Sequence, residues 1–151
     1  MRHRILFPAS LVALAAAGCA PKIQEIKPVA PQDYYYRAAP ERVWNALLLV
    51  YTDLNIPIEN MDKSSWFMRS RDMTLAPAEA RAWMDCVAGE KGVNVSISVT
   101  TLLRPSGDST AMRLALHVDA TRNAGSGRVA IACSTRGALE QRVIELVRQR
   151  L

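Results

Sequence analysis

The sequence predicts an α+β fold: an antiparallel sheet of about 4–6 strands, with a long N-terminal helix and a C-terminal helix packed on one of its faces. Two observations lead to this expectation. Residues 93–118 alternate between apolar and polar side chains on either side of a turn, which is the pattern of a half-buried β-hairpin. Residues 40–54 and 135–151 instead repeat apolar side chains every three or four positions, as amphipathic helices do.

The hairpin is the clearest of these signals. An apolar side chain occupies every second position of both strands, and Pro105-Ser106-Gly107-Asp108 supplies turn residues between them. Because one face of such a sheet is apolar, helices are expected to cover that face. The apolar positions are Val93, Val95, Ile97 and Val99 in the first strand, and Met112, Leu114, Leu116 and Val118 in the second.

The first helix is expected to begin at Pro40, because proline favours the first helical position and Glu41 adds an acid to the first turn. Its two apolar stripes cover a wider arc than a surface helix requires. Either the fold covers this helix on more than one side, or the second stripe is a candidate surface for a partner or ligand. The first stripe comprises Val43, Leu47, Val50 and Leu54, and the second comprises Trp44, Leu48 and Tyr51.

Shorter elements complete the predicted fold. We expect strands at residues 34–36, 55–58, 66–71 and 129–133, a short helix at residues 77–84, and turns at residues 62–65 and 123–127. In the last of these strands, Val129, Ile131 and Cys133 would point the same way. The apolar stripe of the C-terminal helix should lie on the sheet; it comprises Leu139, Val143, Leu146 and Val147.

The N-terminus has the pattern of an export signal. Residues 1–4 are basic, and residues 5–17 are apolar but fall short of the roughly 20 residues that a membrane-spanning helix needs. The stretch Ala16-Ala17-Gly18-Cys19 resembles the signal box of bacterial lipoproteins. The resemblance implies that residues 1–18 are a signal peptide and that Cys19 becomes an acylated first residue. The alternative is an ordinary secretory peptide that contains a cysteine.

The same resemblance predicts the location of the protein. Acyl chains on Cys19 would hold it in the lipid bilayer of the bacterial cell envelope. Ala20, where lipoproteins of the inner membrane often carry aspartate, favours the outer membrane, facing the periplasm. Residues 19–32 contain three prolines and no apolar periodicity, so they are expected to be the lipidated terminus and a linker. Residues 33–151 then form a single periplasmic α+β domain.

The two remaining cysteines are expected to pair. If Cys19 carries lipid, Cys86 and Cys133 are left in an oxidising compartment, which favours a disulfide between them. A zinc site would need about four ligands at close spacing. These two cysteines are far apart in the sequence, and the mature chain contains only one histidine, His117. We therefore expect no metal and no other cofactor.

Charge and motifs exclude several functions. The net charge is +5, or +3 once Arg2 and Arg4 leave with the signal peptide, and the basic residues form no run with interleaved aromatics, so no nucleic-acid binding is expected. His117 and Asp119 could lie near Ser96 and Ser98 across the hairpin. An open polar sheet face offers no pocket and no oxyanion donors, however, so we expect no catalytic residues and no enzymatic activity.

Motifs in both helices suggest a further resemblance. The lipoprotein signal occurs together with Pro40-x-x-Val43-Trp44-x-x-Leu47 and Cys133-Ser134-Thr135-x-Gly137-x-Leu139-Glu140. This combination resembles a group of small bacterial lipoproteins, and the order of elements is similar to the helix-grip domains of BamC, an accessory lipoprotein of the outer-membrane β-barrel assembly machine. The resemblance itself says little about function. The wide apolar arc of the first helix and the tether favour a non-enzymatic accessory module at the outer membrane that binds an envelope protein partner. The alternative is a carrier that holds a small apolar ligand or lipid between sheet and helix.

Overall fold

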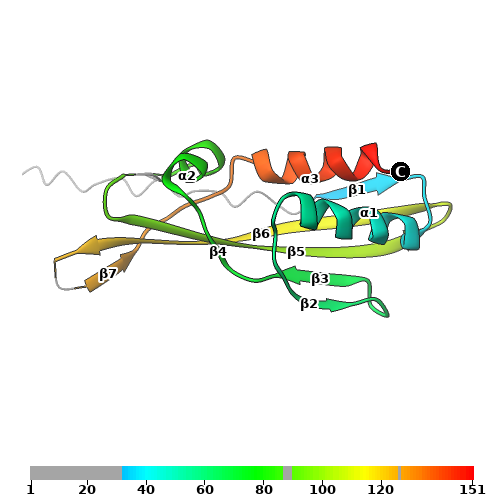
Figure 1. Ribbon diagram of the computed structural model, residues 1–151, viewed down its shortest axis with the longest axis horizontal. Coiled ribbons are helices and arrows are strands. Elements are labelled where there is room, and N and C mark those ends of the chain that lie inside the picture. The colour runs from blue at the N-terminus through cyan, green and yellow to red at the C-terminus, as the bar shows by residue number, and fades with distance from the viewer. Residues whose placement is uncertain (1–31, 87–89, 126) are drawn as a thin grey trace, which may run out of the picture.

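The computed structural model describes residues 32–86, 90–125 and 127–151 (Figure 1). The predicted signal peptide, the lipidation site Cys19 and the linker up to residue 31 lie outside the described residues. The described chain is an α+β fold with one antiparallel sheet and three helices, which confirms the predicted class. Among the described residues, no helix is both long and apolar enough to cross a membrane.

The sheet has seven strands rather than the expected 4–6. Its main path runs β1-β6-β5-β3-β2, while β4 pairs with β5 and β7 pairs with β6. The prediction missed β4 because a strand of two residues has no periodicity to detect. The strands are β1 (Asp33–Tyr36), β2 (Ile58–Asp62), β3 (Phe67–Ser70), β4 (Met73–Thr74), β5 (Val93–Ser106), β6 (Ser109–Ala124) and β7 (Gly127–Ala130).

The β5–β6 hairpin is the centre of the sheet and is longer than predicted. The two strands pair without interruption from Val93 opposite Arg122 to Ser106 opposite Ser109, and Gly107 has the positive φ that the tight turn requires. Val95, Ile97 and Val99 are buried on the face that carries the helices. The opposite face is mainly polar, although the small side chain of Ser98 is buried there as well.

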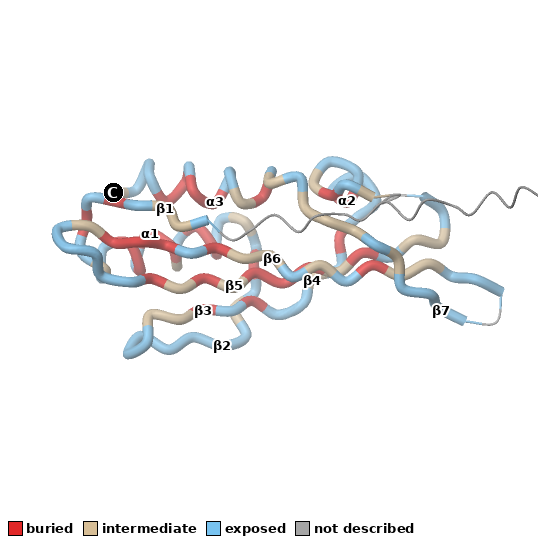
Figure 2. The backbone as a smooth tube through the Cα atoms, turned by 180° about the vertical axis from the view of Figure 1, so that it is seen from behind, coloured by how far each residue is buried: buried red, intermediate tan, exposed pale blue. Residues whose placement is uncertain are grey.

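The helices are α1 (Pro40–Asp53), α2 (Pro77–Trp83) and α3 (Ala138–Gln149). Helix α1 contacts β5, β6 and α3, and α3 also contacts β6 and α2. Figure 1 shows the three helices on the same side of the β5–β6 hairpin, and Figure 2 shows buried residues where the helices and strands meet. The Tyr36 hydroxyl on β1 donates a hydrogen bond to the Ile144 carbonyl of α3 at 3.3 Å, which joins the edge strand to the helical layer.

The sequence explains where α3 begins. Gly137 has φ 80°, a left-handed conformation that side chains disfavour. The Thr135 hydroxyl accepts the Gly137 N–H at 2.9 Å and donates to the Glu140 carboxylate at 3.0 Å. Three residues of the second motif therefore fix the entry into the helix, and Leu139 of the same motif is buried in the core.

The expected strand at residues 129–133 differs from the structure. Strand β7 ends at Ala130, and Val129 is exposed rather than turned towards the core. The Ile131 N–H still donates to the Ala120 carbonyl at 2.9 Å, but the chain then leaves the sheet towards α2. The cause is a competing set of bonds: Ser134 and Arg136 pair with the end of α2 instead of continuing along β6.

Candidate functional site: an apolar cleft

The second stripe of α1, predicted as a candidate partner or ligand surface, is largely buried in the structure. Trp44 is 4% exposed and Tyr51 is fully buried, while Leu48 is half-buried, so these residues belong to the core. The ring of Trp66, in the turn after β2, packs edge-to-face on Trp44 with centroids 5.8 Å apart. Of the two readings of the wide apolar arc, the structure supports coverage of the helix on more than one side.

Burial of α1 on this side encloses the polar hydroxyl group of Tyr51. Its hydroxyl lies 2.9 Å from the Thr101 hydroxyl of β5, so its polar atom is satisfied inside the core. Burial raises the pKa of Tyr51 to about 12, because a phenolate would lose its hydration there. A buried, neutral tyrosine of this kind is a structural group and not an acid or base available to a substrate.

An apolar cleft lies instead at the C-terminal end of α1. It has a volume of about 510 Å³ and is half open to solvent. Four separate parts of the chain form it: residues 54–57 after α1, residues 72–75 around β4, helix α2, and the first turns of α3. Its apolar lining is Leu54, Ile56, Pro57, Met73, Leu75, Trp83, Ala138 and Leu139.

Polar side chains complete the lining of this cleft. Asn55 and Thr74 are neutral, Asp72 and Glu79 are acidic, and Arg142 is basic, so both signs of charge occur. One Glu79 oxygen is already used, because it accepts the Ala76 N–H at 3.0 Å at the start of α2. A mostly apolar cleft with a few polar groups is the usual composition of a binding site. Such a cleft provides contact area for a ligand and a few groups to orient it.

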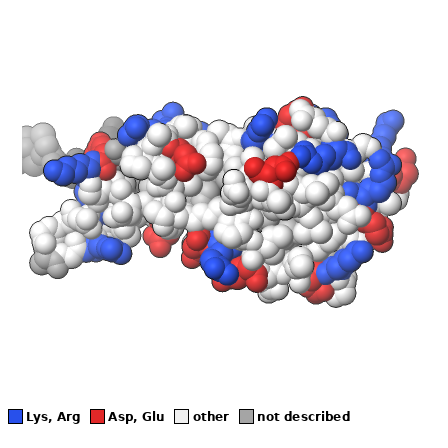
Figure 3. All heavy atoms as spheres, in the orientation of Figure 1, with Lys and Arg blue, Asp and Glu red and all other residues white. Residues whose placement is uncertain are grey.

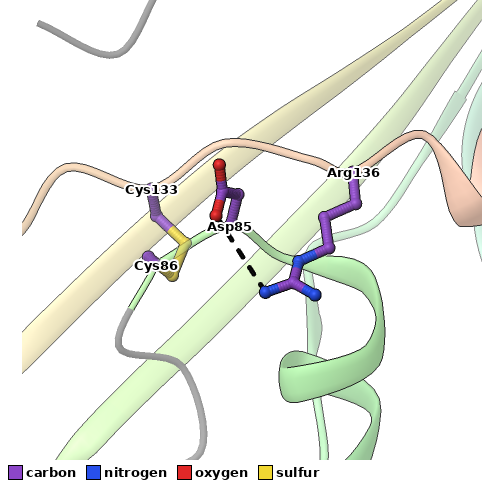
Figure 4. Close-up of a disulfide and its surroundings, with 4 residues drawn as sticks. All are labelled: Asp85, Cys86, Cys133 and Arg136. Carbon is purple, nitrogen blue, oxygen red and sulfur yellow. Dashed lines mark ion pairs between the residues drawn. A yellow bond between two sulfur atoms is a disulfide. The ribbon is translucent and has the colours of Figure 1, made fainter.

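The predicted disulfide between Cys86 and Cys133 is present (Figure 4), three residues after the cleft residue Trp83 and five before the cleft residue Ala138. It joins the segment after α2 to the segment before α3, with the two Cα atoms 4.9 Å apart. Backbone bonds reinforce the junction: the Asp85 N–H donates to Ser134 at 2.7 Å, and the Arg136 N–H donates to Trp83 at 2.7 Å. The cleft residues Trp83 and Leu139 are therefore held on segments that are fixed to each other.

The residues considered for catalysis face one another across the β5–β6 hairpin. His117 and Asp119 are exposed on the polar face of the sheet, opposite Ser98 and Ser96 respectively. Within the described part of the chain, no group of three or more histidine, cysteine, aspartate or glutamate residues could hold a metal ion. Figure 3 shows basic and acidic side chains interspersed over the face in view, without a large area of one sign.

Sequence reasoning placed no functional residue in the apolar cleft. Met73, Leu75 and Trp83 come from a region with no strong periodicity, and only the folded chain brings them beside Leu139. Comparison of the chain with models of protein families gives no match, and comparison with curated proteins gives none either. The function must therefore be argued from the cleft itself.

Proposed function

We propose that this chain is a non-enzymatic lipoprotein of the bacterial envelope whose domain, residues 33–151, binds an envelope protein partner through the apolar cleft. The acylated Cys19 would anchor it in the bilayer, at the outer membrane and facing the periplasm, and residues 19–32 would be the tether. The observation that carries the proposal is a half-open apolar cleft of about 510 Å³ whose sides are fixed by a disulfide.

The lining of the cleft favours an apolar side chain as its occupant. Trp83 and Leu139 offer an aromatic and an aliphatic surface, and buried aromatic or aliphatic anchors contribute most of the energy at protein interfaces. Asp72, Glu79 and Arg142 can hydrogen-bond to backbone groups on either side of such an anchor. Because the cleft is open on one side, a longer chain can enter without passing through the core.

The arrangement of helices supports the likeness to BamC in layout. Helices α1 and α3 contact each other and both contact β6 of the antiparallel sheet. We propose that this packing is helix-grip-like, with α1 as the N-terminal helix and α3 as the C-terminal one. Because fold likeness carries little information on activity, the proposal of partner binding rests on the cleft.

Photocrosslinking in intact cells tests the proposed interface. A photoreactive amino acid at position 142, on the side of the cleft, should crosslink one envelope protein that mass spectrometry identifies repeatedly. The matched control places the same amino acid at Arg69, which is also exposed but lies on β3, outside the cleft. The proposal would fail if both positions gave the same products, or if position 142 gave none.

The anchor is tested separately. The Cys19→Ala variant should move from the membrane fraction to the soluble periplasmic fraction, because the acylated thiol is the proposed attachment. The matched control is the Cys86→Ala, Cys133→Ala variant, which keeps Cys19 and should stay with the membrane. Retention of the Cys19→Ala variant in the membrane fraction would disprove lipidation as the cause of anchoring.

The volume of the cleft also favours a second candidate function. Small-molecule sites commonly enclose about 300–1,000 Å³, and about 510 Å³ falls in this range. In this alternative the protein is a carrier of a small apolar ligand or lipid. Native mass spectrometry of protein purified from cells would then show a bound mass that Trp83→Ala, a substitution at a partly exposed cleft residue, removes. A spectrum of protein without added mass would contradict the carrier role.

A further inference from the structure

A second hollow lies on the opposite, polar face of the sheet, away from the helices. It has a volume of about 280 Å³ and is half open. In contrast to the apolar cleft, every residue that lines it carries a hydrogen-bonding side chain. We call it the polar hollow, and its residues are Thr74, Asn94, Ser96, Asp119, Thr121 and Arg128.

The register of the sheet explains why these side chains meet. Thr74 of β4 pairs with Ser96 of β5, and Ser96 pairs with Asp119 of β6, so these three form one row across the sheet. Directly paired residues in a sheet place their side chains on the same face. Asn94 pairs with Thr121 and forms the next row.

Arg128 closes the hollow from the side of β7. It pairs with Asn123 of β6, two positions along the strand from Thr121, so the two side chains share the polar face. Four strands thus supply one group of polar side chains: β5, β6 and β7, which follow one another in the chain, and β4, which precedes them by a helix. Because the supporting backbone is paired on the β5–β6 ladder, these groups are held by a rigid platform rather than by loops.

The hydrogen-bonding groups of the polar hollow are largely unused by the protein. Within the described residues, the side chains of Asn94, Asp119 and Arg128 form no hydrogen bond or ion pair. The Thr74 and Ser96 hydroxyls lie 3.4 Å apart, which is a weak contact. The hollow therefore offers donors and acceptors from an amide, a carboxylate, a guanidinium and three hydroxyl groups.

The charge of the lining restricts the ligand. One acid, Asp119, and one base, Arg128, balance each other, so the polar hollow has no net attraction for an anion or a cation. It has no apolar lining that would favour a lipid or an aliphatic side chain. A neutral ligand that carries many hydroxyl and amide groups matches these donors and acceptors best, and sugar rings are the common biological molecules of that kind.

We propose that the polar hollow is a saccharide-binding site, which recognises a neutral sugar unit of a glycan chain through Asn94, Asp119 and Arg128. Asp119 accepts hydrogen bonds from sugar hydroxyls, Arg128 donates to ring or hydroxyl oxygens, and Asn94 does both. The site adjoins the apolar cleft at β4, because Thr74 lines both, but Asn94, Asp119 and Arg128 line the polar hollow alone.

Solution NMR on the full chain purified from cells tests this assignment with chitotetraose, a neutral oligosaccharide of N-acetylglucosamine, as the probe. The Asn94 side-chain amide and the backbone amides of Ser96 and Thr121 should shift with added sugar and saturate at millimolar concentration. The Asp119→Ala and Arg128→Ala variants should weaken binding at least tenfold each. His117→Ala, an exposed substitution on the same strand outside the hollow, should leave the affinity unchanged.

Three outcomes would overturn the proposal. The first is the absence of saturable shifts in these residues up to 20 mM sugar. The second is an equal loss of affinity in the His117→Ala variant, which would locate binding elsewhere. The third is tighter binding of alanine, a zwitterionic amino acid that could bridge Asp119 and Arg128, than of the sugar. None of these results depends on the crosslinking from position 142, so the two proposals can fail separately.

Discussion

The disulfide gives the sharpest prediction for stability. Replacing both Cys86 and Cys133 by alanine releases a cross-link between residues 47 positions apart. The chain-entropy model assigns roughly 4 kcal/mol to a closed loop of that size at 25 °C. We therefore expect the free energy of unfolding to fall by about 4 kcal/mol, and the melting temperature of a domain of this length to fall by roughly 15 °C.

Guanidinium denaturation followed by circular dichroism measures the effect. Wild-type protein treated with a thiol reductant should lose as much stability as the double variant, whereas the reductant should not affect the double variant itself. A loss below 1 kcal/mol would refute the chain-entropy reasoning. It would mean that the bonds from Asp85 to Ser134 and from Arg136 to Trp83 hold the junction without the disulfide.

Hydrogen exchange then separates two possible causes of the loss. If the disulfide stabilises the protein by restricting the unfolded chain, the amides of Asp85 and Arg136 in the double variant should still exchange only through global unfolding. If it acts on the folded state, these two amides should exchange much faster than those of β5 in the same variant. In that second case the apolar cleft would widen, because Trp83 and Leu139 would no longer be fixed to each other.

Three further predictions concern the core and the pH dependence of stability. Leu47→Ala should cost about 3 kcal/mol in a denaturant titration because Leu47 is fully buried, whereas Leu49→Ala, at a position 57% exposed on the same helix, should cost under about 0.5 kcal/mol. Burial raises the pKa of Tyr51 to about 12, so its contribution to stability is complete below pH 10 and should decrease by about 1.4 kcal/mol per pH unit up to pH 12. Burial also raises the pKa of Tyr36 to about 12, so Tyr51→Phe should reduce the measured decrease without abolishing it. Hydrogen bonds from Ser64 and Ser65 lower the pKa of Asp62 to about 2, so its contribution should be complete above pH 4 and vanish as the pH falls towards 2, as NMR titration of its carboxyl group would show.

The local signals in the sequence were sufficient for the main elements. Alternation along residues 93–118 correctly predicted the hairpin, and Pro40 correctly predicted the first residue of α1. These predictions succeed because periodicity and backbone preference act on neighbouring residues. Trp66 shows the limit of such local signals: the sequence predicts a strand there, but the residue lies in the turn before β3 with a positive φ of 56°, and its ring packs on Trp44.

The second stripe on α1 could not be assigned from sequence for a related reason. The angular width of an apolar arc states how much of a helix must be covered, but it does not state what covers it. Here Trp66 covers Trp44, and Thr101 of β5 satisfies the hydroxyl of Tyr51. Both partners are distant in sequence, so buried packing and an exposed binding surface predict the same pattern of residues in the helix.

The apolar cleft and the polar hollow differ in how far the sequence specifies them. Alternation already assigns Asn94, Ser96 and Asp119 to the polar face, and Thr121 follows on the same strand, so four of the six residues that line the hollow lie on the hairpin. The other two, Thr74 and Arg128, require β4 and β7 to pair with opposite edges of that hairpin, and neither short strand has a sequence pattern that identifies its partner. The apolar cleft has no such starting point, because its lining comes from the ends of elements, where the chain changes direction and periodicity is lost. Binding sites at the ends of elements therefore need the folded structure for their detection, whereas a site on a sheet face can be partly deduced from strand parity.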